Sequence, residues 1–333
     1  MAPILEVRNL RVEFPTRRGT LTALDDVSFE IAPGEVLGVV GESGAGKSMT
    51  GAAIIGLLEP PGRIAAGQIL LNGRRIDNLG YEAMRRIRGR EIGAIFQDPL
   101  TTLNPLYTVG RQLVETIQTH LGLNDAEARK RAIGWLEMVG IPAAAQRVDS
   151  YPHEFSGGMR QRVVIALALC AEPKLIVADE PTTALDVSIQ AQVIALLKGL
   201  ARDKGTSMML VTHDMGVIAE TADRVAVMYA GRIAEIGPVR EVVKHPKHPY
   251  SRGLMASIPP LDRKVEYLAQ IDGAMPRLSA IPPGCAFNPR CPEVFGRCRV
   301  ERPNLLPAGA TRAACWLYDP ASEKRAPEAM QHG

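Results

Sequence analysis

The sequence has 333 residues, of which 46% are hydrophobic and 23% are charged, as is typical of soluble globular proteins. Its formal net charge of +3 comes from basic residues spread along the whole chain, which argues against nucleic-acid binding. The N-terminal stretch MAPILEVRNLRVEF lacks the features of a secretory signal, and the longest apolar run, VVIALALCA at 163–171, is too short to span a membrane, so we expect a cytosolic protein.

Residues 41–48 read GESGAGKS, which fits the P-loop pattern G-x-x-x-x-G-K-S. The apolar run before it, Val36–Val40, predicts a strand, and a helix is expected to begin near Lys47. In such a loop backbone N–H groups face phosphate oxygens, the lysine reaches the β- and γ-phosphates, and the serine is a ligand of Mg²⁺. A glycine-rich turn before a helix is the alternative. The predicted ATP-binding residues are Gly41, Glu42, Ser43, Gly44, Ala45, Gly46, Lys47, Ser48 and Met49.

Further short apolar runs, EIGAIF, KLIVADE and SMMLVTHD, alternate with helical patterns, which predicts an α/β domain over residues 1–245. Between about 100 and 165 the pattern is helical without strands, so we expect an inserted helical subdomain, with Asn124 as the N-cap of one helix. Residues 246–333 contain 13 of the 25 prolines and four of the five cysteines. This composition predicts a separate, loop-rich C-terminal extension.

The run LIVADE is an apolar strand that ends in two carboxylates, where P-loop enzymes place a Mg²⁺ aspartate. Neighbouring residues of a strand point to opposite faces, so Asp179 and Glu180 are expected to have different roles. We assign Asp179 to Mg²⁺ and Glu180 to the attacking water, as a base or an orienting group. An ordinary strand end is the alternative, which the P-loop upstream disfavours.

The stretch FSGGMRQRVVIALAL places Ser156, Gly157 and Gly158 at the start of a long helix, where a second phosphate could bind. A serine N-cap followed by glycines is the alternative. Here the sequence resembles the ATP-binding cassette family, whose signature motif is this helix start. The resemblance implies a RecA-like α/β core with a helical subdomain, and ATP bound between the P-loop of one subunit and the signature of the other.

Three more family marks occur in the expected order: Gln97 in IFQDP, Asp186 in ALD, and His213 in LVTHD. The resemblance implies that Gln97 contacts Mg²⁺ and the water, that Asp186 lies at the dimer interface, and that His213 contacts the γ-phosphate. Gln97 and His213 could instead be polar residues that cap strand ends.

An aromatic side chain near the N-terminus stacks on adenine in this family, and Phe14 is the candidate. Because Leu10, Val12 and Phe14 alternate on one face, a core phenylalanine is an equal alternative. The remaining histidines show no ligand spacing and are expected to be solvated or structural; they are His120, His153, His245, His248 and His332.

The segments DPLTTLNPLYTVG, KHPKHPYSRGLMASIP and AIPPGCAFNPRCPE resemble the ATPase subunits of dipeptide and oligopeptide importers, with nickel importers as near neighbours. The resemblance implies a peripheral protein on the cytoplasmic face of the membrane. Its implied partners are a second ATPase, which in this branch is usually a paralogue, two integral permease subunits and an extracytoplasmic solute-binding protein. The other hypotheses are a non-transport ABC ATPase acting on ribosomes or DNA and a metal-binding regulatory module with a dead ATPase site.

Four cysteines of the extension, Cys285, Cys291, Cys298 and Cys315, are separated by five, six and sixteen residues. Disulfides rarely persist in the cytosol, and this spacing lacks the C-x₂₋₄-C pairs usual in zinc sites. The resemblance implies a four-iron four-sulfur cluster held by these thiolates, with zinc and free thiols as alternatives. We expect the cluster to stabilise the extension or to sense redox state without a part in hydrolysis, and Cys170 to be a buried helix residue.

Overall fold

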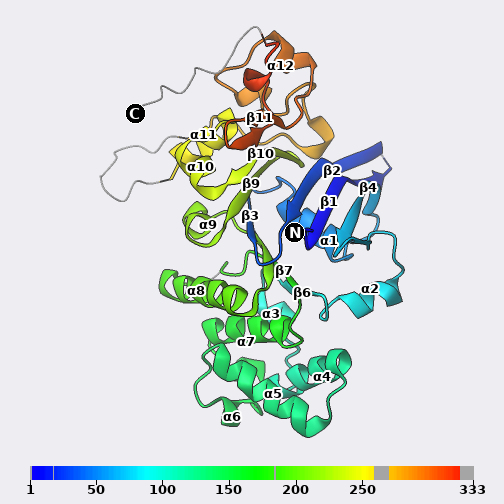
Figure 1. Ribbon diagram of the computed structural model, residues 1–333, viewed down its shortest axis with the longest axis vertical. Coiled ribbons are helices and arrows are strands. Elements are labelled where there is room, and N and C mark those ends of the chain that lie inside the picture. Colours follow the sequence, from blue (N-terminus) through cyan, green and yellow to red (C-terminus); the bar gives the residue numbers. More distant parts are fainter. Residues whose placement is uncertain (1, 18, 184, 259–269, 323–333) are drawn as a thin grey trace.

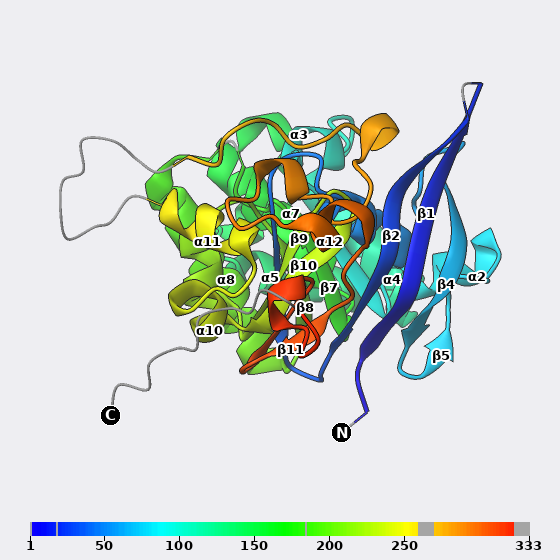
Figure 2. The ribbon, with the colours of Figure 1, turned by 90° about the horizontal axis from the view of Figure 1, so that it is seen from above.

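The computed structural model describes residues 2–17, 19–183, 185–258 and 270–322. A small antiparallel sheet with the strand order β2-β1-β4-β5 stands along one side of the molecule (Figure 2). Alternate residues of its longest strands are buried in one apolar cluster with the first helix, α1. These strands are β1 (Leu5–Thr16), β2 (Gly19–Ile31), β4 (Arg63–Leu71) and β5 (Arg74–Arg75).

The main sheet has eight strands in the order β11-β12-β10-β9-β3-β8-β7-β6. Strands β9, β3, β8, β7 and β6 pair in parallel, and β3 and β8 are buried along their whole length, as continuous apolar runs predict. The strands are β3 (Val36–Val40), β6 (Ile92–Ile95), β7 (Leu175–Asp179), β8 (Ser207–Val211), β9 (Arg224–Tyr229), β10 (Arg232–Pro238), β11 (Leu306–Ala308) and β12 (Thr311–Ala313).

The helical stretch without strands is confirmed, and it lies at the opposite end of the molecule from the C-terminal extension (Figure 1). Asn124 caps its helix in a capping box with Glu127, as the sequence predicted for the asparagine. The first seven helices are α1 (Lys47–Ile54), α2 (Tyr81–Ile87), α3 (Pro99–Thr102), α4 (Val109–Leu121), α5 (Asp125–Met138), α6 (Ala144–Arg147) and α7 (Gly157–Leu169).

The later helices flank the main sheet or belong to the extension (Figure 1). They are α8 (Val187–Lys204), α9 (Met215–Thr221), α10 (Val239–Lys244), α11 (Pro249–Ala256) and α12 (Gly296–Val300), with single 3₁₀ turns η1 (Pro152–Glu154), η2 (Leu278–Ala280), η3 (Asn288–Arg290) and η4 (Trp316–Tyr318). None of the helices that the structure describes is both long enough and apolar enough to cross a bilayer.

The C-terminal extension is continuous with the α/β domain, in contrast to the separate unit expected from composition. Its strand β12 pairs with β10, so that the extension forms the last two strands of the main sheet. The buried carboxylate of Glu235 in β10 accepts hydrogen bonds from the backbone N–H groups of Lys247 and His248 and from the hydroxyl of Thr311. The sequence composition did not reveal the pairing of β12 with β10, because β11 and β12 are only three residues long and give no recognisable strand pattern.

Candidate functional site

Four loops meet at one edge of the main sheet, because the carboxyl ends of the parallel strands β3, β6, β7 and β8 lie there together. The P-loop follows β3, and the glycines at positions 41, 44 and 46 have φ angles of 150°, 81° and 102°. A Cβ atom at Gly41 would lie 2.3 Å from the carbonyl oxygen of Met228. Only glycine therefore lets the chain turn tightly enough here for its backbone to wrap around an anion.

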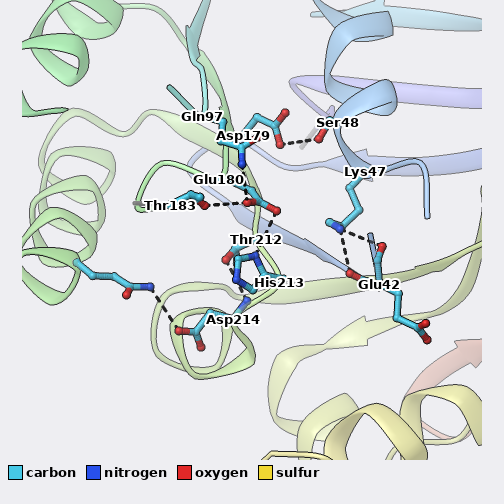
Figure 3. A network of polar contacts seen from close by, with 12 residues as sticks. Glu42, Lys47, Ser48, Gln97, Asp179, Glu180, Thr183, Thr212, His213 and Asp214 are labelled. Atoms are coloured by element: carbon cyan, nitrogen blue, oxygen red, sulfur yellow. Dashed lines mark hydrogen bonds and ion pairs between the residues drawn. The ribbon is translucent and has the colours of Figure 1, made fainter. Parts of the chain in front are cut away.

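Lys47 begins α1 and is only 6% exposed. Its Nζ donates to the carbonyl oxygens of Gly41 and Glu42 at 2.9 and 3.2 Å, inside the loop (Figure 3). Burial lowers the pKa of Lys47, although the negative charges of Glu180 and Asp179 oppose that shift. A partly desolvated ammonium held in a loop of N–H groups is suited to bind a phosphate.

The hydroxyl of Ser48 donates to Oδ1 of Asp179 at 3.0 Å, which joins the P-loop to the end of β7 (Figure 3). Burial raises the pKa of Asp179; the hydrogen bond from Ser48 opposes this rise and the charge of Glu180 adds to it. A serine hydroxyl beside a half-buried carboxylate is an oxygen pair of the kind that Mg²⁺ prefers.

Glu180 faces a different set of residues from Asp179, but not for the reason that the sequence suggested. Strand β7 ends at Asp179, and Glu180 has a left-handed backbone with a φ of 46°, so strand alternation does not apply to it. Its carboxylate accepts hydrogen bonds from Gln97 Nε2 at 3.3 Å and from the hydroxyl of Thr183 at 2.7 Å, and it lies 3.2 Å from Nδ1 of His213. Three loops thus converge on one carboxylate.

These contacts also set the ionisation of Glu180. Partial burial pushes the pKa of its carboxyl group up, but hydrogen bonds with Thr183 and His213 outweigh burial and hold the pKa below its usual value. The carboxylate is therefore charged at neutral pH. A charged, oriented carboxylate of this kind can hold or deprotonate a water molecule.

The signature residues lie apart from the P-loop within this chain, because α7 and α1 are separated in Figure 1. Ser156 is the N-cap of α7, and its side chain accepts from the N–H of Met159 at 3.4 Å. Gly158 packs against α8, where an added Cβ would meet Ile189 at 2.7 Å. Asp186, at the N-cap of α8, is exposed. The serine N-cap is thus present, and a phosphate on this helix would be a different one from that on the P-loop.

Phe14 lies in β1, two residues before the strand ends at Thr16. Its ring packs against the apolar cluster, close to Gly62, and it also lines a cavity of about 300 Å³ together with Ser48, Met49 and Asp179. The position is compatible with both a core phenylalanine and a platform for adenine, because the ring packs against the core and also lines a cavity beside Ser48 of the P-loop.

A family described as an ABC transporter matches residues 24–183, and one described as the oligopeptide/dipeptide transporter C-terminal region matches residues 234–298. The dipeptide transport ATP-binding protein DppD of Bacillus subtilis is 47% identical over 325 residues, which cover 97% of each chain. The chain belongs to the ABC transporter family. The oligopeptide transport ATP-binding protein OppD of Salmonella typhimurium is also similar to this ABC ATPase, with 49% identity over 300 residues, 90% of this chain and 89% of OppD.

Solved ABC cassettes confirm the expected α/β nucleotide-binding fold of this ABC ATPase. A dimeric post-hydrolysis structure of the cassette MJ0796, bound to ADP and Pi, is 28% identical with a TM-score of 0.64, and it covers 71% of this chain and 99% of that one. CbiO1 of Clostridium perfringens is 30% identical with a TM-score of 0.63, covering 74% of this chain and 92% of its own. Membership of the ABC transporter family, shown by the match over residues 24–183 and by the relatives, makes ATP the nucleotide.

The ABC ATPase carries its four C-terminal cysteines around one small cavity of about 20 Å³. All are free thiols; Cys298 and Cys315 are buried, and Cys285 and Cys291 are partly buried. Burial raises the pKa of Cys285 to about 11 and that of Cys315 to about 12, and the neighbouring cysteines add to both shifts. Among the described residues, no group of three or more His, Cys, Asp or Glu could hold a metal ion. Cys170 is buried in the main core, as predicted.

Several residues of the extension reach the P-loop, and sequence reasoning missed them. Tyr250 accepts a hydrogen bond from the N–H of Glu42 at 2.9 Å, and Nη1 of Arg290 donates to the Glu42 carboxylate at 3.0 Å. The methyl group of Met275 lies near Gly44. Each contact joins residues more than 200 positions apart, so no local pattern could have revealed it.

Another cavity, of about 620 Å³, lies between β2, β10 and the extension. Arg232 and Arg302 line it. Arg232 pairs with Asp26 and Arg302 pairs with Asp25, so the charge of each arginine is largely neutralised by its aspartate. None of the P-loop residues 41–48 lines it, so its size alone does not identify it as the nucleotide site. The chemistry lies at the carboxyl edge of the parallel strands.

Proposed function

We propose that this protein is the ATP-hydrolysing subunit that energises a membrane importer for dipeptides or oligopeptides. The observation that carries the proposal is the combination, in one chain, of an intact P-loop and carboxylate site with an extension that matches the peptide-transporter C-terminal region. Relatives named for dipeptide and oligopeptide transport match along nearly the whole length of the chain, which supports the same solute class.

In the proposed reaction Lys47 and the P-loop N–H groups bind the β- and γ-phosphates. Met49, the residue after Ser48 in α1, is the last residue of this nucleotide-binding segment. Ser48, Asp179 and Gln97 would hold Mg²⁺, which neutralises phosphate charge when bound. Glu180 orients the attacking water or takes its proton, and Gln97 and His213 hold the Glu180 carboxylate in place. His213 is 66% exposed, which leaves its ring accessible to the γ-phosphate.

The active unit is proposed to be a head-to-tail pair of ATPase subunits, because the signature on α7 lies apart from the P-loop of its own chain (Figure 1). Ser156, Gly157 and Gly158 would then contact the ATP bound by the partner. The partner is either a second copy or, as is usual in this branch, a paralogue. If the isolated chain pairs with itself, its specific ATPase rate should rise with protein concentration; a high rate independent of concentration at high dilution would contradict a composite site.

The surface that contacts the permease subunits is proposed to lie next to Gln97, at the start of the helical part. Three large apolar side chains are exposed there: Phe96 at 43%, Leu106 at 79% and Tyr107 at 36%. Exposed apolar groups gathered in one segment are typical of docking sites. Leu106→Glu should abolish transport while ATP affinity stays unchanged. Val300→Glu, at a site 73% exposed on the extension, is the matched control and should preserve transport.

The decisive test of the function is mass spectrometry of the detergent-solubilised complex, followed by uptake assays with labelled dipeptides. We expect two integral permease subunits and a second ATPase to copurify, an extracytoplasmic solute-binding protein to complete the importer, and the chain to be peripheral on the cytoplasmic face of the membrane. Uptake of nickel or another small solute in place of peptides would assign a different cargo. Recovery with ribosomes or DNA and no membrane protein would refute the transport function.

For the cysteine site we propose a four-iron four-sulfur cluster on Cys285, Cys291, Cys298 and Cys315. The four residues line one cavity, which supports a shared group. Zinc held by the same thiolates is the alternative. The described residues contain no group of three or more His, Cys, Asp or Glu that could hold a metal ion, so the proposal is supported by the shared cavity and by the resemblance of the extension.

Protein purified without oxygen should be brown and contain about four iron and four sulfide per chain. Serine at any of the four positions should remove the colour and lower the stability of the extension, whereas Cys170→Ser should leave the colour unchanged. Colourless protein with stoichiometric zinc would replace the cluster with the zinc alternative.

A further inference from the structure

Arg290 lies between the cysteine site and the P-loop. Its side chain is 7% exposed, and Nη1 donates to both carboxylate oxygens of Glu42, at 3.0 and 3.2 Å. Its Nε donates to the carbonyl oxygen of Asp272 at 2.8 Å, and its Nη2 to that of Ile271 at 3.3 Å. All three nitrogens thus have separate partners, which fixes the guanidinium plane.

Glu42 links this guanidinium to the phosphate-binding backbone. Its N–H donates to the hydroxyl of Tyr250, and its carbonyl oxygen accepts from Nζ of Lys47. Figure 3 shows the Glu42 carboxylate pointing away from Lys47. The side chain of Glu42 therefore serves as an anchor to the extension, while its backbone belongs to the nucleotide site.

At its other end Arg290 is part of the cysteine loop, residues 284–298. It ends the short turn η3, which lies between Cys285 and Cys291. Asn288 in this turn donates through Nδ2 to the carbonyl oxygen of Cys285 at 2.8 Å, and the N–H of Cys285 donates to the carbonyl oxygen of Cys298 at 2.9 Å. A displacement of either flanking cysteine would move the turn that carries Arg290.

From these contacts we propose that Arg290 couples the cysteine loop to the P-loop. A chemical change at the cysteines that displaces this loop then changes the affinity for ATP. Arg290 is a positioning residue, because it reaches the phosphate-binding backbone only through Glu42. The expectation that the cysteines act apart from the nucleotide rested on their distance from the P-loop in sequence. In the fold, Arg290 of the cysteine loop contacts Glu42 of the P-loop directly. Coupling of binding free energies is reciprocal, so ATP must in turn stabilise the cysteine loop.

The first test measures the dissociation constant of Mg²⁺-ATP for the full chain. Arg290→Gln should weaken binding on the order of tenfold, within the range usual for coupled sites. Arg290→Lys should behave similarly, because one ammonium group cannot reach three separate partners. Cys291→Ser should weaken ATP binding in the wild-type background but add little to Arg290→Gln, since the two changes interrupt one connection.

The second test follows amide hydrogen exchange in residues 284–298 with and without Mg²⁺-ATP, which does not depend on turnover. ATP should slow exchange in the wild-type protein and have no such effect in Arg290→Gln. Arg297→Gln is the matched control: Arg297 pairs with Asp319 and Glu301 within the extension, so its loss should leave the response to ATP intact.

If Arg290→Gln prevents the extension from folding, exchange will be fast throughout residues 284–318 without nucleotide. Glu42→Gln then tests the same connection from the P-loop side, because it leaves the contacts of Arg290 with Asp272 and Ile271 in place. The proposal is overturned if the variant that folds shows the wild-type ATP affinity and the wild-type exchange response. It is also overturned if Cys291→Ser leaves ATP affinity unchanged.

Discussion

Nδ1 of His213 lies 3.2 Å from Oε1 of Glu180, although the two residues are 33 positions apart. They meet because β7 and β8 are parallel neighbours, so the loops that follow these strands leave the sheet at the same edge. Burial alone would raise the pKa of Glu180. The hydrogen bond from Thr183 and this contact with His213 outweigh burial and hold the pKa below its usual value. A charged carboxylate fixed in this way is the group on which the first prediction depends.

Glu180→Gln should bind Mg²⁺-ATP with nearly normal affinity and hydrolyse it about 10²- to 10³-fold more slowly, since the amide cannot take a proton. Steady-state phosphate release and equilibrium ATP binding check the two parts separately. Glu172→Gln is the control, because Glu172 forms only surface ion pairs with Arg131 and Lys204. Wild-type turnover in Glu180→Gln would show that this residue has another role.

Lys47→Ala should weaken ATP binding by roughly 10- to 100-fold, the range expected when a charged hydrogen bond is lost. The reason is that Lys47 is the buried ammonium of the P-loop, only 6% exposed. Calorimetric titration with a non-hydrolysable ATP analogue measures the change. Lys198→Ala, which removes a surface contact with the carbonyl oxygen of Glu220, should bind the analogue as the wild type does.

The free energy of unfolding should fall as the pH drops from about 6.5 toward 3, and His248 should cause part of this loss. Burial lowers the pKa of His248 from 6.5 to about 3, and Nδ1 accepts the N–H of Tyr250 in the neutral ring. Between these pH values the unfolded chain binds a proton that the folded chain does not, so acid favours unfolding. At about 1.4 kcal/mol per pH unit, the full effect is at most about 5 kcal/mol.

Urea denaturation at several pH values checks this prediction. His248→Asn keeps an acceptor for Tyr250 but cannot titrate, so its stability should depend less steeply on pH. His245→Asn is the matched control, because His245 is 62% exposed and should leave the wild-type slope unchanged. Equal slopes for His248→Asn and the wild type would contradict the assignment.

Glu235→Ala should lower the free energy of unfolding by about 2–5 kcal/mol, because it leaves buried donors without an acceptor. The donors are the N–H groups of Lys247 and His248 and the hydroxyl of Thr311. Chemical denaturation gives the value. Glu241→Ala, on the surface of α10, should change stability by less than about 0.5 kcal/mol. If Glu235→Ala lowers the free energy of unfolding by less than about 0.5 kcal/mol, the extension is held to the sheet by other contacts.

Local signals in the sequence predicted much of the nucleotide site. Apolar runs marked β3, β7 and β8, and Asn124 marked a helix start, because strand burial and helix capping depend on residues close together in the chain. The family resemblance implied that Gln97 and His213 act at the nucleotide, but not that their side chains meet the carboxylate of Glu180. The left-handed backbone of Glu180 left no local signal.

By itself, the sequence determined the P-loop with its strand and helix, the capped helix starts and the membership of a nucleotide-binding family. These features depend on spacing over a few residues, where backbone geometry leaves few options. Only the tertiary structure decided that the extension completes the main sheet and that Arg290 holds Glu42. Both depend on contacts between residues 76 to 248 positions apart, and no local pattern of residues encodes such pairs.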